Sequence, residues 1–92
     1  MSELFDAVEN DDIDRVRQLL DQGADPNIEN NTGHTALIRA SHGNIEIVKL
    51  LLNSGANPNI RGPTGAVALM YASHKGHTEI VRLLLNSGAD LN

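Results

Sequence analysis

The sequence predicts an all-α solenoid of stacked helix–turn–helix units, and three observations support this prediction. The chain repeats itself over nearly all of its 92 residues, each repeat reads as two short amphipathic helices, and the composition includes one Phe, one Tyr and no Trp or Cys. Helices of about ten residues are marginal alone in water, so they must be held by stacking on their neighbours. Any core must therefore be aliphatic.

The internal repeat is visible without any outside comparison. Three stretches read alike: VRQLLDQGADPNI (residues 16–28), VKLLLNSGANPNI (48–60) and VRLLLNSGADLN (81–92). Two upstream stretches also match once a single gap is allowed: LIRASHGNIEIV (37–48) and LMYASHKGHTEIV (69–81). Self-similarity at a fixed period of about 33 residues indicates a repeat architecture.

The first helix of the second unit is predicted to begin after Thr35, whose hydroxyl can cap it. It is predicted to run to about His42, because Gly43 then interrupts it. The third unit has Val67 at the position of Thr35. A valine side chain accepts no hydrogen bond, so this helix is expected to start less firmly.

The second helix of each unit carries clearer start and stop signals. Asp12 and Asn44 are residue types that cap helix N-termini. Gly55 can adopt the left-handed conformation that ends a helix, and Pro58 forbids continuation. Residues 59–65 are rich in turn formers, so we expect a projecting loop there.

Several short motifs carry a family resemblance. They are Gly33-x-Thr35-x-Leu37, Ala72 to His77, the Glu-Ile-Val-x-Leu-Leu-Leu runs Glu46 to Leu52 and Glu79 to Leu85, and the Gly-Ala-Asp/Asn-x-Asn runs that begin at Gly23, Gly55 and Gly88. Together they resemble the ankyrin repeat over essentially the whole chain. The resemblance implies one ankyrin-repeat domain over residues 1–92, with repeats at 1–29, 30–61 and 62–92. It also implies antiparallel helix pairs, stacked in an L shape, with β-turn fingers along one edge.

The sequence departs from the family pattern at two points. The family's Thr-Pro-Leu-His appears as Thr35–Ile38 and Val67–Met70, so the proline at the first helical position is missing. The Asp that usually opens each finger is replaced by Asn30 and Gly62. These departures leave the expected fold unchanged.

The two ends of the array are predicted to differ. Arg15 and Gln18 are polar where later units have apolar residues, as expected for a helix that no earlier repeat covers. The last repeat instead stays apolar at Val81, Leu84 and Leu85. Repeat arrays generally need a polar outer face, so this end suggests a fragment of a longer array, a self-associating chain, or a minimal or engineered array.

Composition excludes several functions. Residues 1–31 hold nine acids and two bases, and residues 32–92 hold three acids and five bases, which disfavours nucleic acid as a partner. His74 and His77 have an H-x-x-H spacing but supply too few ligands for zinc, and no phosphate loop or oriented nucleophile is evident. We therefore expect no metal, no cofactor and no enzyme activity. The acidic start and short apolar runs suggest neither a signal peptide nor a membrane partner, and favour a cytoplasmic or nuclear location.

Residues that are not needed for helix capping, turns or core packing are the candidate functional residues. The resemblance implies a non-catalytic protein–protein interaction module that binds a protein partner through its concave face and finger tips. The alternative is a minimal or engineered scaffold without a natural partner. The predicted partner-binding residues are Glu29, Asn31, Thr32, His34, Arg39, His42, Arg61, Pro63, Thr64, Ala66, Tyr71, His74 and Lys75. With Asp6 and Glu9, they predict a groove that runs from acidic to basic.

Overall fold

Six α-helices lie within residues 3–90, the part of the chain that the computed structural model describes. They are α1 (Glu3–Glu9), α2 (Ile13–Asp21), α3 (Ala36–Ala40), α4 (Ile45–Asn53), α5 (Ala68–Lys75) and α6 (Thr78–Asn86). Over the same residues, the β-type pairing is limited to one isolated antiparallel bridge between Glu29 and Thr35. The predicted all-α class is confirmed.

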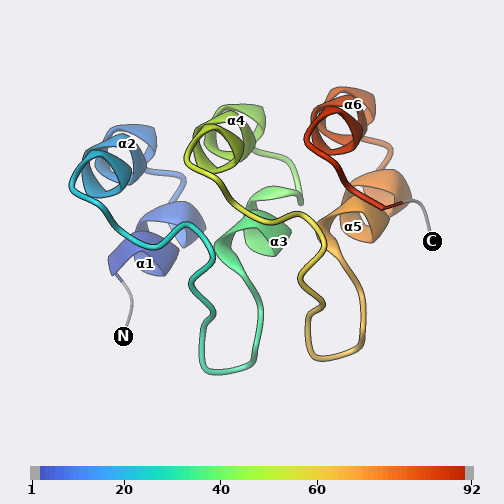
Figure 1. The fold of residues 1–92 in the computed structure, drawn as a ribbon, viewed down its shortest axis with the longest axis horizontal. Helices are drawn as coiled ribbons and strands as arrows, with labels where there is room; N and C mark the ends of the chain where they lie inside the picture. The colour runs from blue at the N-terminus through green and yellow to red at the C-terminus, as the bar shows by residue number, and fades with distance from the viewer. Residues whose placement is uncertain (1–2, 91–92) are drawn as a thin grey trace.

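The helices form two layers (Figure 1). α1, α3 and α5 lie side by side in an inner layer, and α2, α4 and α6 lie side by side in an outer layer. The long axis of the molecule, 32 Å, runs along the stack. The loops between α2 and α3 and between α4 and α5 extend beyond the inner layer as two projecting fingers. We call residues 28–35 the first finger and residues 60–67 the second finger.

Side-chain caps set where the helices begin. Thr35 Oγ1 accepts a hydrogen bond from the Ile38 backbone N–H at 3.1 Å. Asp12 and Asn44 accept in the same way from the third residues of α2 and α4, at 3.2 and 3.0 Å. These three predicted caps are confirmed. At the start of α5, Val67 makes no side-chain cap bond, as the sequence predicts.

The predicted length of α3 is wrong. The helix ends at Ala40 and not near His42. Ser41, which is fully buried, donates both its backbone N–H, at 2.9 Å, and its hydroxyl, at 2.7 Å, to the Leu37 carbonyl, so its side chain is hydrogen-bonded at the helix end. The matching turn of the third unit has one residue more, and α5 continues to Lys75.

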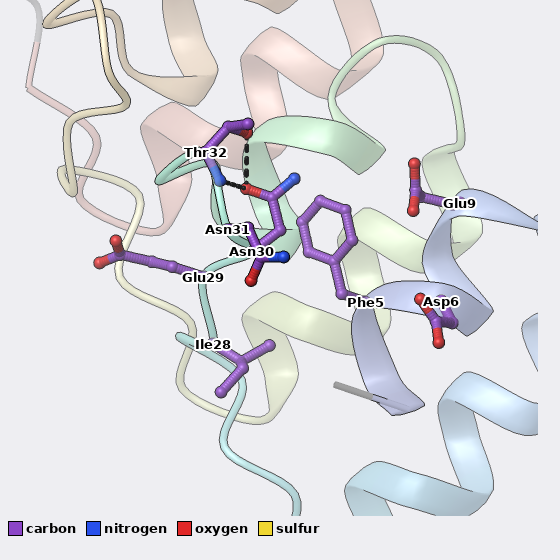
Figure 2. Close-up of a pocket in the computed structure, with 8 residues that line it drawn as sticks. All are labelled: Phe5, Asp6, Glu9, Ile28, Glu29, Asn30, Asn31 and Thr32. Carbon is purple, nitrogen blue, oxygen red and sulfur yellow. Dashed lines mark hydrogen bonds between the residues drawn. The ribbon is translucent and has the colours of Figure 1, made fainter. Parts of the chain in front are cut away.

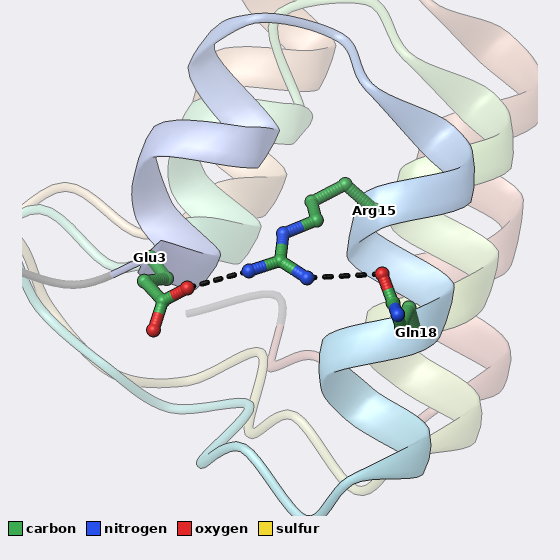
Figure 3. Close-up of polar contacts among 3 residues, drawn as sticks. All are labelled: Glu3, Arg15 and Gln18. Carbon is green, nitrogen blue, oxygen red and sulfur yellow. Dashed lines mark hydrogen bonds and ion pairs between the residues drawn. The ribbon is translucent and has the colours of Figure 1, made fainter.

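The core continues from repeat to repeat. Ile47 on α4 and Ile80 on α6 have no exposed surface, in agreement with a helix face that contacts the preceding repeat. At the corresponding position of α2, Arg15 instead pairs with Glu3 and Gln18 (Figure 3). The predicted polar N-terminal end of the stack is confirmed.

The last repeat corrects one prediction. Leu84 is 0 % exposed, like its counterpart Leu51, so it does not belong to an open face. Val81 is half-buried, and Leu85 is 38 % exposed. Met70, on α5, is 48 % exposed. Within residues 3–90, the exposed large apolar side chains are therefore Met70 and Leu85, with Val81 half-buried and Leu84 buried.

Asparagine side chains connect each repeat to the next along the loops. Asn27 Oδ1 accepts a hydrogen bond from the Asn57 backbone N–H at 2.6 Å. One repeat later, Asn59 Oδ1 accepts from the Asp90 N–H at 2.8 Å, and Asn59 Nδ2 donates to the Gly88 carbonyl at 3.1 Å. The repeated Gly-Ala-x-x-Asn pattern thus supplies directional bonds that fix the register of stacking.

A second set of inter-repeat bonds lies at the turns inside each helix pair. Asn44 Nδ2 donates to Asp11 Oδ1 at 3.0 Å, and His77 Nε2 donates to the His42 carbonyl at 2.8 Å. Both donors occupy the N-cap position of an outer helix. His77 is therefore used by the stack, and the H-x-x-H spacing that it forms with His74 has a structural explanation.

Replacing Val67 by threonine (Val67→Thr) should stabilise the protein. The introduced hydroxyl can accept a hydrogen bond from the third residue of α5, as Thr35 does in α3, and such a cap contributes about 1 kcal/mol. We expect the thermal midpoint to rise by about 4–8 °C. The reverse change, Thr35→Val, should lower it by a similar amount. An unchanged or lower midpoint for Val67→Thr would show that the missing cap is unimportant.

Candidate functional site

A cavity of about 450 Å³ lies between α1 and the first finger (Figure 2). Its walls are Phe5, Asp6, Glu9, Ile28, Glu29, Asn30, Asn31 and Thr32. The ring of Phe5, which is 4 % exposed, points into the space between α1 and the finger, toward Asn30. The cavity therefore has an apolar floor and a polar rim, a combination typical of binding sites.

A second cavity of about 260 Å³ adjoins the first. It shares Phe5, Glu9 and Asn30 with the first cavity and adds His34, Arg39 and His42. The Tyr71 ring on α5 lies 4.9 Å from the His42 ring, with an interplanar angle of 37°. Side chains of the first finger and of the inner helices thus form one row that runs from α1 across α3 to α5.

The charges along this row change sign. Asp6, Glu9 and Glu29 line the first cavity, whereas Arg39 lines the second. The three ion pairs found within residues 3–90 join other residues, so none of these four side chains is paired there within 4 Å. Lys75 is exposed at the end of α5 and lines neither cavity. This order agrees with the predicted change from acidic to basic.

The first finger is organised by one side chain. Asn30 Oδ1 accepts hydrogen bonds from the Thr32 N–H at 3.0 Å, the Thr32 hydroxyl at 2.8 Å and the His34 N–H at 3.0 Å. Thr32 Oγ1 also lies 2.8 Å from His34 Nδ1. Thr32 and His34, predicted to be free for a partner, therefore also hold the finger in shape.

The second finger lacks this organiser because Gly62 stands at the position of Asn30. Its backbone closes through the Gly62 N–H, which donates to the Ala66 carbonyl at 2.7 Å. Arg61 Nη1 donates to the Gly65 carbonyl at 2.8 Å. Arg61, another predicted contact residue, is thus partly engaged within its own finger.

The structure brings some of the predicted contact residues together and leaves others apart. Those that line the two cavities are Glu29, Asn31, Thr32, His34, Arg39 and His42. The remaining ones lie on the second finger or on α5 and line neither cavity: Arg61, Pro63, Thr64, Ala66, Tyr71, His74 and Lys75. Pro63 nevertheless lies beside the first finger, since a Cβ added to Gly33 would be 3.7 Å from its Cγ.

Three wall residues are not among the predicted ones. Phe5, Ile28 and Asn30 line the first cavity, and Phe5 and Asn30 also line the second. Sequence reasoning gives Phe5 no role beyond the prediction of an aliphatic core, and it places Asn30 at the start of the finger. The one signal that could have identified Phe5 is its status as the single phenylalanine in an aliphatic chain.

Two other features are not found within residues 3–90. In that part of the chain no cluster of three or more His, Asp or Glu side chains is suited to hold a metal ion. Nor does any helix there combine the length and apolar character needed to cross a membrane. The arrangement of groups in the two cavities is suited to hydrogen bonding and charge pairing with a ligand.

Stacked helix pairs with projecting fingers define the class of helical-repeat solenoids. The family model for ankyrin repeats, in three copies, matches residues 4–92. The chain belongs to the ankyrin-repeat family, whose general role is protein binding and whose members are typically non-catalytic. A comparison with curated proteins finds no significant match. The family assignment therefore rests on the repeat motifs and the fold together.

Replacing Asn30 by Ala should loosen the first finger, because the finger loses the oxygen that accepts from Thr32 and His34. We expect a loss of about 1–2 kcal/mol of stability and faster amide exchange at these two residues, measured by NMR. Asn31→Ala is the matched control, since Asn31 is exposed and makes none of these bonds. Unchanged exchange in Asn30→Ala would contradict the organising role.

Proposed function

We propose that the chain is a non-catalytic interaction module that binds a protein partner through the inner helices and the fingers. The observation that carries this proposal is the pair of adjoining cavities, which lie between α1, the first finger and α3. An apolar floor with convergent polar groups is typical of binding sites. The general role of ankyrin repeats supports the same reading.

Preorganisation is the proposed mechanism. The backbone of the groove is fixed by helix stacking, and Asn30 fixes the finger. Binding then requires little ordering of the protein, so more of the contact energy appears as affinity. Arg39 and Tyr71 are half-buried and belong to the residue types enriched at binding hot spots. We expect them to anchor the partner, with the exposed His74 and Lys75 extending the contact.

The test uses charge reversal on the two layers of the stack. Arg39→Glu should weaken partner binding roughly tenfold or more, since a lost hydrogen bond to a charged group costs about 1.5–3 kcal/mol. Arg82→Glu, an equal charge change on the exposed side of α6, is the control and should bind normally. Both variants should keep the wild-type melting midpoint. Affinity capture followed by titration calorimetry with the purified partner measures the effect.

Two outcomes would contradict the proposal. If Arg39→Glu binds as well as the wild type while Arg82→Glu does not, the outer layer is the contact surface. If no partner is captured and the chain folds with high reversible stability, the scaffold alternative is favoured.

A second candidate interaction is with another copy of the chain, through the exposed Met70 and Leu85. Met70 occupies the position that Ile38 occupies one repeat earlier. Ile38 lies against the second finger, because its Cδ1 would be 3.4 Å from a Cβ placed on Gly62. The N-terminal end carries the polar Arg15 cluster, so we propose that two C-terminal ends meet around a two-fold axis.

Sedimentation velocity tests this self-association. The wild type should show a dimer that grows with concentration, and Leu85→Lys should abolish it by placing a charge in the contact. Asn86→Lys adds the same charge at the neighbouring exposed position and serves as the control. A wild type that stays strictly monomeric at high concentration would contradict the proposal.

A further inference from the structure

The first of the two adjoining cavities is lined by acids without a base, the second also by Arg39, and we propose that together they select a pair of neighbouring opposite charges in an extended segment of the partner. The cavity beside α1 would accept a basic side chain, arginine or lysine. The cavity beside α3 would accept an acidic side chain close to it in sequence. This inference rests on the proposed function and specifies the class of partner that the groove recognises.

The first cavity has the two features that a basic side chain needs. Its buried Phe5 and half-buried Ile28 provide apolar surface for the aliphatic stem of lysine or arginine. Asp6, Glu9 and Glu29 provide carboxylates for the cationic head. At about 450 Å³, the cavity also falls within the range of roughly 300–1,000 Å³ that is common for ligand pockets.

The carboxylates of this cavity are available to a ligand. Across residues 3–90, Arg15 pairs with Glu3, Arg17 with Asp14 and Lys49 with Glu46, and these pairs involve no cavity residue. Asp6 and Glu9 lie on α1 and Glu29 lies on the first finger, so the carboxylates come from both walls of the cavity. The acids therefore favour a positively charged occupant over a neutral one.

The second cavity adds a positive charge, that of Arg39, to Glu9, which lines both cavities. Arg39 is half-buried there and lies within 4 Å of no carboxylate in residues 3–90. Its guanidinium can bind a carboxylate through two parallel hydrogen bonds. Glu9 lines both cavities, so the two subsites are neighbours, and both charges must be carried close together on one segment. An extended peptide meets this requirement, whereas a phosphate backbone would be repelled by the first cavity.

Peptide selection provides the probe. A random peptide library displayed on phage is selected against the whole chain, and the enriched peptides are synthesised and titrated. We expect a consensus with one Arg or Lys followed or preceded within a few positions by Asp or Glu. Binding should weaken as salt is raised, because exposed charge pairs are screened over about 10 Å at 0.1 M salt.

The decisive variant is Glu9→Lys, with Asp21→Lys as its matched control. Glu9 is the last residue of α1 and Asp21 is the last residue of α2, both are exposed acids, and the charge change is the same. Glu9→Lys should weaken a selected peptide about tenfold or more, whereas Asp21→Lys should leave its affinity within about twofold. Changing the basic residue of the peptide to Glu should restore binding to Glu9→Lys.

The outcomes separate this inference from the proposed function. If peptides bind through Arg39 but carry no basic residue, or if Glu9→Lys binds them normally, the proposed charge pairing is wrong and the groove remains a binding surface. A library that yields no groove binder also overturns the inference. The proposed function then still depends on the capture of a folded partner, which Arg39→Glu tests separately.

Discussion

Contact between neighbouring repeats is the interaction on which the rest of this structure depends. α3 spans five residues and could not persist alone in water. Ile47, Val48 and Ile80 have no exposed surface because each helix pair covers the next. Burial of one such side chain contributes about 1.5–3 kcal/mol, whereas a typical hydrogen bond contributes about 0.5–1.5 kcal/mol. Apolar contact therefore supplies most of the stability, and the asparagine and histidine bonds between repeats fix the register.

The groove is a consequence of the same stacking. The inner helices present Glu9, Arg39 and Tyr71 in successive repeats, and the first finger lines the same cavities as Glu9 and Arg39. Tyr71 also packs against the core and the His42 ring, so it joins neighbouring repeats as well. Under the proposed function, Glu9 and Arg39 lie on a support that other residues hold in place, as expected when binding residues are separate from the core.

The sequence predicts the fold better than it predicts the site. The repeat period and the caps at Asp12, Thr35 and Asn44 are local signals, and the structure confirms them. Sequence reasoning wrongly places Leu84 on the exposed face. Apolar residues on one helix can face the partner helix of the same repeat or the next repeat, and spacing alone does not distinguish these two sets. Phe5 is missed because its place in the cavity wall depends on the position of the first finger, which is distant from it in the sequence. The contact residues of a partner depend in addition on the shape of that partner.

The two fingers are fixed by different means, and this difference has an evolutionary consequence. The first has three hydrogen bonds to the Asn30 side chain, whereas the second has Gly62 at that position and is held by its backbone bonds and one bond from the Arg61 side chain. Substitutions in the first finger are thus constrained by its internal bonding. The second finger is freer to accumulate neutral changes. New side chains can therefore be introduced at the second finger while Asn30 keeps the shape of the first.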